Sequence, residues 1–416
     1  MLHTLIFLAR KRLEKFGGKI IGVTGTIGKT TTKDAIGHIL SQHYRVFKSQ
    51  ASYNSEFGIP LTILGESSPQ RAFYLWPLII IRSVIKLLRP TRKYDFVVLE
   101  MGVDKPGDME DLLSWIHPDI AVMTRIGEKY IEEGRFTSPE HMYADVKKLV
   151  EFVAHKHSGL LLLNEDDPYQ KEYISSYDKN ATLIPYSSEH QCNQSPIIAK
   201  ADGIHFTVHA VHHHIPLILP ILGKWHIEAV LPAILLGFQN NIPAPLLQQG
   251  CLSFHMPKGR LNPIPGIRGS IIVDSSYNAT PYATKKALEV FLDFPEHRHI
   301  FVFGNMNSLE ADTERFHRSV GEIIPTYVDI LITVGEGPKF AADEAVKHGF
   351  LKEKIFHFDD ATTAGKFFRN ECTGRDVILV KGSQNNVRLE KFIKEVMENP
   401  ADATKLLVRQ SKEWNK

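Results

Sequence analysis

Four short runs of consecutive apolar residues stand out in the first part of the chain, each followed by a segment with helical spacing of apolar positions. Strands that are apolar along their whole length are typical of parallel sheets covered by helices on both faces. The pattern therefore predicts a doubly wound α/β domain. The predicted strands are residues 19–24, 95–100, 120–124 and 159–164.

The second part of the chain repeats this alternation, which predicts a second, Rossmann-like domain. Between the two, residues 195–222 alternate over short distances without a long helical pattern, so we expect a small β subdomain there. We place the first domain at residues 1–257, including this subdomain and an N-terminal amphipathic helix, and the second at 258–416. The strands predicted for the second domain are residues 270–274, 299–303, 330–334 and 377–380.

Two segments combine apolar and basic positions. Residues 1–16 have the pattern of an amphipathic helix, and within residues 72–93 the positions Leu78, Ile81, Ile85 and Leu88 share a helix face. We interpret the second segment as a helix packed on its own protein. The alternative is peripheral contact of residues 1–16 and 72–93 with an anionic membrane. The longest uncharged apolar run, residues 72–81, is far shorter than the about 20 residues that a spanning helix needs, so we expect no membrane crossing.

Composition narrows the class of protein. The 416 residues suffice for two domains, and 49 basic against 47 acidic side chains give a net charge of +2. This balance argues against a dedicated nucleic-acid partner. The three cysteines, Cys192, Cys251 and Cys372, lie far apart, which excludes a disulfide framework or a cysteine zinc site and fits the reducing cytoplasm. We expect a cytoplasmic monomer.

A glycine-rich segment, 24–31, lies between a predicted strand and a predicted helix. Glycines there let backbone N–H groups surround phosphates, and the helix N-terminus adds its positive end. Lys29 is placed to reach the β- and γ-phosphates of ATP, and the Thr30 hydroxyl to bind Mg²⁺. Val23 stands where the strict eight-residue motif has glycine, so the loop is a shorter variant. The predicted ATP contacts are Gly25, Thr26, Gly28, Lys29, Thr30 and Thr31.

Glu100 ends the second predicted strand. Carboxylates at the carboxyl ends of parallel strands face the crevice where ligands bind. We therefore predict that Glu100 shares a Mg²⁺ ion with Thr30. The alternative is an ordinary acidic side chain in solvent.

Seven motifs in order resemble the Mur ligase family, over residues from about 19 to 400. Within the family, the segments at 53–60 and 274–281 look most like the ligase that adds D-alanyl-D-alanine to a muramoyl-tripeptide precursor of the cell wall. The motifs are the phosphate loop, Tyr53–Pro60, Leu99–Gly102, Asn164–Asp167, Gly259-Arg260, Asp274–Pro281 and Lys381–Ser383.

The resemblance implies an ATP- and Mg²⁺-dependent ligase with an acyl-phosphate intermediate. It implies catalytic roles for Lys29 and Glu100, and for Lys147 as a carbamylated lysine. It also implies that Arg260 reaches the ATP phosphates. For Tyr277, burial in the core is the alternative. The resemblance further assigns Asp274, Tyr277 and Asn278 to ATP, and Asn54, Glu56, Lys381 and Ser383 to the substrate.

Departures from the family pattern leave alternatives open. The phosphate loop begins after only some twenty residues, so we expect that the family's N-terminal domain, which holds the UDP-sugar, is absent; an acceptor of another kind, lipid-linked or free of UDP, is one alternative. Tyr130 replaces an expected histidine, and Asn305 replaces an expected aspartate. These two replacements motivate the other alternative, a nucleotide-binding scaffold without catalysis.

Overall fold

The computed structural model describes most of the chain, in two compact units. The first unit comprises Met1–Ile197, Phe206–Ile218 and Trp225–Phe254, and the second comprises the rest. The expected β subdomain is thus divided between the units, and the predicted domain limits stay a prediction. The described residues are 1–49, 56–67, 75–90, 92–126, 136–192, 196–200, 203–210, 213–307, 309, 312–383, 387–410 and 414.

The first unit is built on a six-stranded parallel sheet in the order β2-β3-β1-β4-β5-β6. The four strands predicted for this part are its central strands, which are buried on both faces. The sequence pattern missed the short edge strands β2 and β6, which are half-exposed. The strands are β1 Lys19–Thr24, β2 Val46–Lys48, β3 Phe96–Glu100, β4 Ile120–Met123, β5 Leu160–Asn164 and β6 Thr182–Tyr186.

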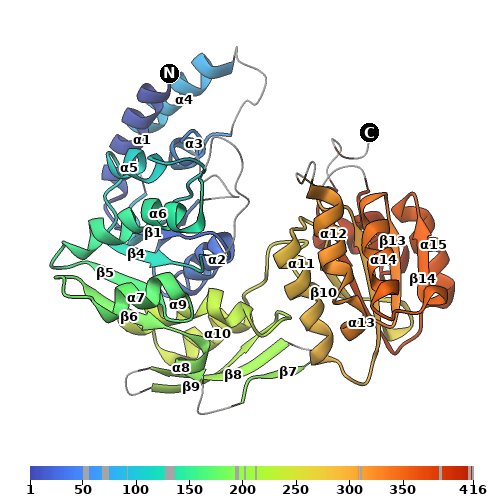
Figure 1. Cartoon of the computed structure of the whole chain (residues 1–416). Coiled ribbons are helices and arrows are strands. Elements are labelled where there is room, and N and C mark those ends of the chain that lie inside the picture. Colours follow the sequence, from blue (N-terminus) through green and yellow to red (C-terminus); the bar gives the residue numbers. More distant parts are fainter. Residues whose placement is uncertain are drawn as a thin grey trace. The chain divides into compact units, whose positions relative to one another are not determined.

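Helices cover both faces of this sheet (Figure 1). Helices α1, α3, α4, α5 and α6 contribute to one buried core with β3, β4 and β5, while α2 and α9 pack against each other. The doubly wound architecture is confirmed. The helices are α1 Leu2–Phe16, α2 Lys29–Leu40, α3 Gly58–Leu64, α4 Trp76–Leu88, α5 Asp108–Leu113, α6 Pro139–Ala154, α7 Pro168–Ser175, α8 Ser188–Cys192, α9 His226–Gln239 and α10 Ala244–Leu252.

The second unit contains a six-stranded sheet in the order β10-β11-β15-β12-β13-β14. Only β10 is antiparallel to its neighbour. The four predicted strands correspond to β11, β12, β13 and β15, which confirms the Rossmann-like fold. The strands are β10 Asn262–Pro265, β11 Ile271–Ser275, β12 Arg298–Gly304, β13 Ile330–Val334, β14 Ile355–Phe358 and β15 Asp376–Lys381.

The remaining elements complete the second unit and a separate small sheet. None of the helices in the described part of the chain is both long and apolar enough to span a membrane. The helices of the second unit are α11 Pro281–Leu288, α12 Thr313–Gly321, α13 Ile324–Tyr327, α14 Gly337–Lys347, α15 Ala361–Glu371, α16 Glu390–Val396 and α17 Ala403–Leu406. The small sheet is β7 Ile198–Lys200, β8 Gly203–Ala210 and β9 His213–Leu219.

Candidate functional site

The loop between β1 and α2 depends on two glycines for its conformation. Gly25 and Gly28 have φ angles of 117° and 86°, in the left-handed region that favours glycine. A Cβ atom at Gly25 would lie 2.3 Å from the Thr124 hydroxyl oxygen, so a larger residue does not fit. The Lys29 ammonium lies over the loop and donates to the carbonyls of Gly25 at 2.8 Å and Thr26 at 3.3 Å. These groups surround the N-terminus of a helix, where an anion is stabilised.

A carboxylate and a hydroxyl meet beside this loop. Strands β1 and β3 are parallel neighbours with Val23 paired to Glu100, so the Glu100 side chain emerges next to the loop. Thr30 Oγ1 donates to Glu100 Oε1 at 3.2 Å. Because Glu100 is only 2% exposed, its interpretation as an acidic side chain in solvent is wrong. Thr31, the next residue of α2, is also buried.

A buried lysine behind the loop was missed by the sequence analysis. Lys33 has no exposed surface, and its Nζ lies 3.9 Å from Glu100 Oε2 and 3.6 Å from Asp34 Oδ1. Burial lowers the pKa of Lys33, while the charges of Asp34 and Glu100 oppose this effect. Lys33 follows Lys29 by four residues, which places both on one face of α2 and was the available signal. Its charge stabilises the Glu100 carboxylate beside Thr30.

The segment after β4 anchors the loop. The Arg125 carbonyl accepts the N–H groups of Thr26 and Ile27, each at 3.1 Å. The Arg125 guanidinium in turn makes two hydrogen bonds with the Glu228 carboxylate of α9, at 3.0 and 3.1 Å. Bidentate pairs of this kind fix geometry as well as charge. Arg125 therefore binds the loop through its carbonyl, while its guanidinium is itself held in place by Glu228.

In the second unit, a buried carboxylate lies at the end of β11. Asp274 has no exposed surface, and its Oδ1 accepts the N–H of Ser276 at 3.0 Å. Burial raises the pKa of Asp274 to about 6, although its hydrogen bonds with Ser276 oppose this. Arg409, which the sequence analysis did not single out, donates to the Ser276 carbonyl at 2.6 Å and to Glu390 at 3.0 Å. A buried ion pair thus supports the loop that follows Asp274.

Two further predicted site residues lie at the end of the adjacent strand β15 and just after it. Ser275 of β11 is paired with Lys381, which is 3% exposed. The Lys381 ammonium donates to Ser275 Oγ at 3.1 Å and to the Asn278 carbonyl at 3.0 Å. Burial, and secondly the positive charge of Arg260, lowers the pKa of Lys381 to about 7. The Ser383 hydroxyl donates to Asn278 Oδ1 at 3.2 Å, which joins the loops after the two strands.

Arg260 and Tyr277 form a pair at the same end of this sheet. The Tyr277 N–H donates to the Gly259 carbonyl at 3.1 Å, and the Arg260 guanidinium lies 5.1 Å from the centre of the Tyr277 ring. Tyr277 is 37% exposed, so its interpretation as a core residue is wrong. A planar cation over an aromatic face is a stabilising arrangement that leaves guanidinium N–H groups available to an anion.

Three predicted residues of the first unit have less support. Asn54 lies outside the described residues. Glu56 lies in an exposed turn before α3. Lys147 lies on α6, where its Nζ is 3.5 Å from Glu151 and 4.9 Å from the centre of the Tyr173 ring. The roles of all three stay predictions.

One departure from the family pattern has a structural explanation. Asn305 Oδ1 accepts the N–H of Gly337 at 3.0 Å, and its carbonyl accepts the N–H of Ser383 at 2.8 Å. An aspartate at this position would offer the same acceptor, so the replacement preserves the loop. The other departure, Tyr130, lies outside the described residues.

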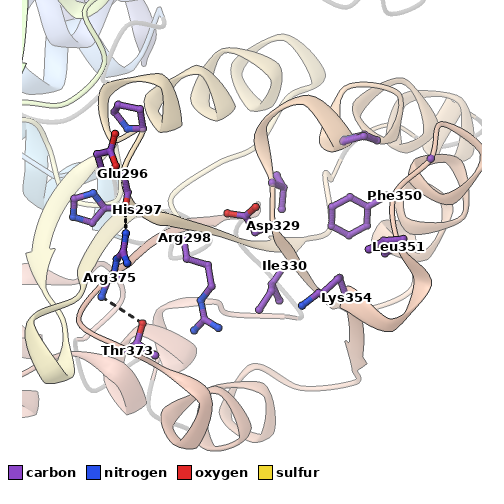
Figure 2. A pocket seen from close by; sticks show the side chains of 14 residues that line it. Glu296, His297, Arg298, Asp329, Ile330, Phe350, Leu351, Lys354, Thr373 and Arg375 are labelled. Carbon is purple, nitrogen blue, oxygen red and sulfur yellow. Dashed lines mark hydrogen bonds between the residues drawn. The ribbon is translucent and has the colours of Figure 1, made fainter.

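A cleft of about 750 Å³ lies at the other end of the second unit's sheet, where its strands begin (Figure 2). It is lined by residues at the amino ends of β12, β13 and β15. Its arginines are already engaged, since Arg298 makes two hydrogen bonds with Asp376 and Arg375 donates to the Glu296 carbonyl. Because the cleft lies at the amino ends of these strands and the predicted site residues of this unit lie at the carboxyl ends, the two are separate.

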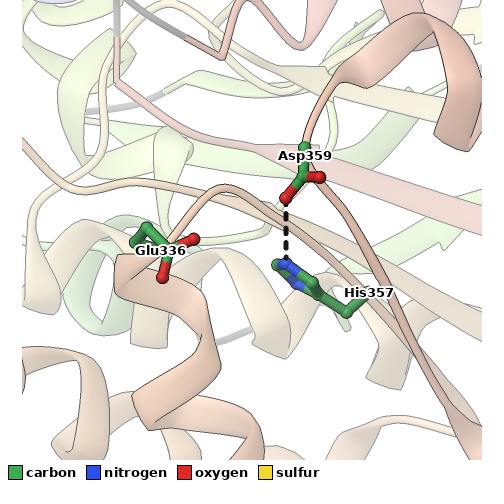
Figure 3. A group of neighbouring side chains, drawn as sticks. All are labelled: Glu336, His357 and Asp359. Carbon is green, nitrogen blue, oxygen red and sulfur yellow. Dashed lines mark ion pairs between the residues drawn. The ribbon is translucent and has the colours of Figure 1, made fainter.

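Among the described residues, one cluster has ligand atoms that converge closely enough to hold a metal ion. It consists of Glu336 after β13, His357 in β14 and Asp359 directly after β14 (Figure 3). All three are exposed, and Glu336 already pairs with Lys339 at 2.8 Å. We assign no metal to this cluster.

Comparison with known proteins places both units in one family. Residues 23–74 and 80–237 match the Mur ligase middle domain, and residues 259–384 match the Mur ligase, glutamate ligase domain. The chain is 27% identical over 401 residues to UDP-N-acetylmuramoyl-tripeptide–D-alanyl-D-alanine ligase from Bacillus subtilis (strain 168). This match covers 96% of the chain and 80% of the relative.

Solved structures show the same fold. MurF ligase from Thermotoga maritima in complex with ADP has a TM-score of 0.75 at 23% identity, covering 95% of this chain and 84% of that one. A MurF structure from Acinetobacter baumannii has a TM-score of 0.76 at 20% identity, covering 95% and 80%. The two matched domains extend over more than half of the chain. The chain belongs to the Mur ligase family.

Proposed function

We propose that this protein is an ATP-dependent, ADP-forming amide ligase that adds D-alanyl-D-alanine to a muramoyl-tripeptide precursor of the cell wall. The observation that carries the proposal is the cluster of Lys29, Thr30, Lys33 and Glu100 around the phosphate loop. The relatives named as D-alanyl-D-alanine ligases match along nearly the whole chain, which supports the choice of substrates. We further propose that it acts as a monomer in the cytoplasm, where its thiols stay reduced.

The proposed reaction brings two negatively charged groups into contact. A substrate carboxylate attacks the γ-phosphate of ATP, ADP leaves, and the amine of the dipeptide then displaces phosphate from the acyl phosphate. Both partners of the first step are anions, so fixed cations and dipoles are needed where they meet. Lys29 and the N-terminus of α2 supply positive charge in the first unit. Lys381 and Arg260 are the corresponding cations of the second unit.

The residues beside the loop fit a Mg²⁺ ion. Thr30 and Glu100 offer a hydroxyl and a carboxylate oxygen 3.2 Å apart, and Mg²⁺ prefers oxygen ligands of these kinds. When bound, the ion neutralises phosphate charge. The Lys33 ammonium lies 3.9 Å from Glu100 Oε2 and supplies a positive charge beside this carboxylate.

A substrate panel tests the proposal. Purified protein is incubated with ATP, Mg²⁺ and D-alanyl-D-alanine, together with UDP-linked tripeptide, lipid-linked precursor or free tripeptide. Phosphate release is measured, and the product is identified by mass spectrometry. We expect a product that is heavier by one dipeptide less one water, with the UDP-linked acceptor. Lys29→Ala is the matched inactive control.

The other outcomes decide between the alternatives. Product only with the lipid-linked or free acceptor would keep the ligase and replace the substrate. ATP binding without phosphate release from any acceptor would identify a nucleotide-binding scaffold. Light scattering of the same preparation tests the monomer.

A further inference from the structure

Helix α4 presents an apolar stripe to solvent. Leu78, Ile81, Ile85 and Leu88 are 42%, 56%, 45% and 79% exposed. Their spacing places them on one face of the helix, while Trp76 is buried on the opposite face. A contiguous exposed apolar stripe marks an interaction surface.

The helix that carries the stripe is fixed to its neighbours. The Lys86 ammonium of α4 donates to the Gly65 carbonyl at the end of α3, at 2.7 Å. Lys15 of α1 donates to the Leu87 carbonyl of α4 at 2.6 Å. Cations at the carboxyl ends of helices are favourable interactions. Figure 1 shows α1 and α4 side by side, so the stripe belongs to an ordered helical layer.

The same layer concentrates positive charge. Residues 75–93 contain five lysines and arginines and no acidic residue, and residues 1–16 contain four and one acid. These segments carry +8 in total, while the whole chain carries +2, so the remaining residues carry −6. Arg82 follows Ile81 about 100° around the helix, and Arg89 directly follows Leu88, at which the helix ends. Neither arginine makes an ion pair with a residue that the structure describes.

We propose that α4, together with α1, docks flat on an anionic membrane surface. The stripe would enter the boundary between headgroups and acyl chains, while Arg82 and Arg89 would meet lipid phosphates. At 13 residues α4 is only about 20 Å long, shorter than the about 30 Å apolar core of a bilayer, so it lies along the interface. A second copy would bring the same positive charges face to face, which disfavours a dimer through this surface.

Vesicle flotation of the full chain tests the docking surface. The probe is a set of vesicles of phosphatidylcholine with one quarter phosphatidylglycerol, compared with pure phosphatidylcholine. We expect binding to the anionic vesicles that weakens with added salt. The Ile81→Ser/Leu88→Ser variant should bind at least tenfold more weakly. The control is Leu292→Ser/Leu351→Ser, which removes two leucines of the second unit that are 65% and 57% exposed.

A charge variant separates the electrostatic contribution. Each basic side chain near an anionic surface contributes about fivefold to binding, so Arg82→Gln/Arg89→Gln should bind roughly twenty-five-fold more weakly. The control is Lys352→Gln/Lys366→Gln, which removes two exposed cations of the second unit. Circular dichroism verifies that each variant is folded.

Three results would overturn the proposal. The first is a wild type that does not bind anionic vesicles, or that binds neutral ones equally well. The second is an equal loss of binding in the control variants. The third is a dimer in light scattering that the Ile81→Ser/Leu88→Ser variant dissociates, which would assign the stripe to a second copy. Vesicle binding needs no turnover, so failure of the ligase assay leaves this inference standing.

Discussion

Replacement of Asp274 by asparagine should remove a pH dependence from the stability of the second unit. Burial raises the pKa of Asp274 to about 6 from an ordinary 3.8. Between these pH values the folded state holds a proton that the unfolded chain releases, so this contribution to stability is lost as the pH rises through the window. The gap corresponds to about 3 kcal/mol, at about 1.4 kcal/mol for each tenfold change.

Asparagine cannot titrate, yet its amide oxygen can still accept the N–H of Ser276. The free energy of unfolding of Asp274→Asn, relative to wild type, should therefore rise by about 2.5 kcal/mol between pH 4 and pH 7, since the unfolded side chain is already partly ionised at pH 4. Urea titrations at several pH values provide the measurement. Cys372 is a buried free thiol of the second unit, while Cys192 and Cys251 are buried in the first. Pulsed thiol labelling with mass spectrometry then reports the unfolding midpoint of each unit separately.

Asp376→Asn is the matched control. Asp376 is also fully buried in this unit, and burial by itself raises its pKa, but the hydrogen bonds with Arg298 and Thr373 and the charge of Arg298 together lower it. The contribution of Asp376 to stability therefore changes with pH only below about pH 4. Asp376→Asn should destabilise the unit equally at pH 4.5 and 7.5. Parallel midpoints for Asp274→Asn and wild type across the pH range would refute the reasoning.

Four further substitutions test the catalytic machinery. Lys29→Ala should lower phosphate release at least a hundredfold with an unchanged circular dichroism spectrum, and near-normal release would refute its assignment to the phosphates. Lys33→Met should destabilise the first unit by about 3 kcal/mol, read from its thiol labels, because the buried Glu100 carboxylate loses its cation; an unchanged midpoint would contradict this. Lys147→Ala should lose activity that short carboxylic acids partly restore, as expected for a carbamate, whereas full activity would remove Lys147 from the site. Arg260→Ala should lower kcat about a hundredfold while the Kd for ATP changes less, since its contact is expected in the transition state; equal losses in kcat and affinity would count against that role.

The central strands and the phosphate loop were predictable because their sequence signals are local. A strand that is buried on both faces is apolar along most of its length, and this holds for the central strands of both sheets, whose buried charges lie at or next to the strand ends. The edge strands β2 and β14 are half-exposed and mix apolar with polar residues, so no local pattern marks them. Glycines at Gly25 and Gly28 are needed by the backbone itself, which makes the loop visible without tertiary information.

The buried charges could not be predicted in the same way. Lysine is usually solvated, so the sequence did not show that folding would enclose Lys33 and Lys381, although the four-residue spacing from Lys29 places Lys33 on the same face of α2. Each is buried by elements distant in sequence, as the contacts of Lys33 with Glu100 and of Lys381 with Ser275 show. Arg409 likewise reaches Glu390 and the Ser276 carbonyl only through the tertiary fold.

The buried lysines of the two units have different surroundings, and this difference affects the proposed chemistry. In the first unit, the buried Lys33 ammonium lies 3.9 Å from the Glu100 carboxylate, so each buried charge has a partner of opposite sign. In the second unit, burial lowers the pKa of Lys381 to about 7, so its ammonium releases a proton more easily than that of a solvated lysine. If Lys381 meets an anionic substrate group, as the family resemblance implies, that anion favours the charged lysine and draws a proton. The buried amine would then become a full cation only when negative charge is present to stabilise it, so that its cost of desolvation is offset at the moment of binding.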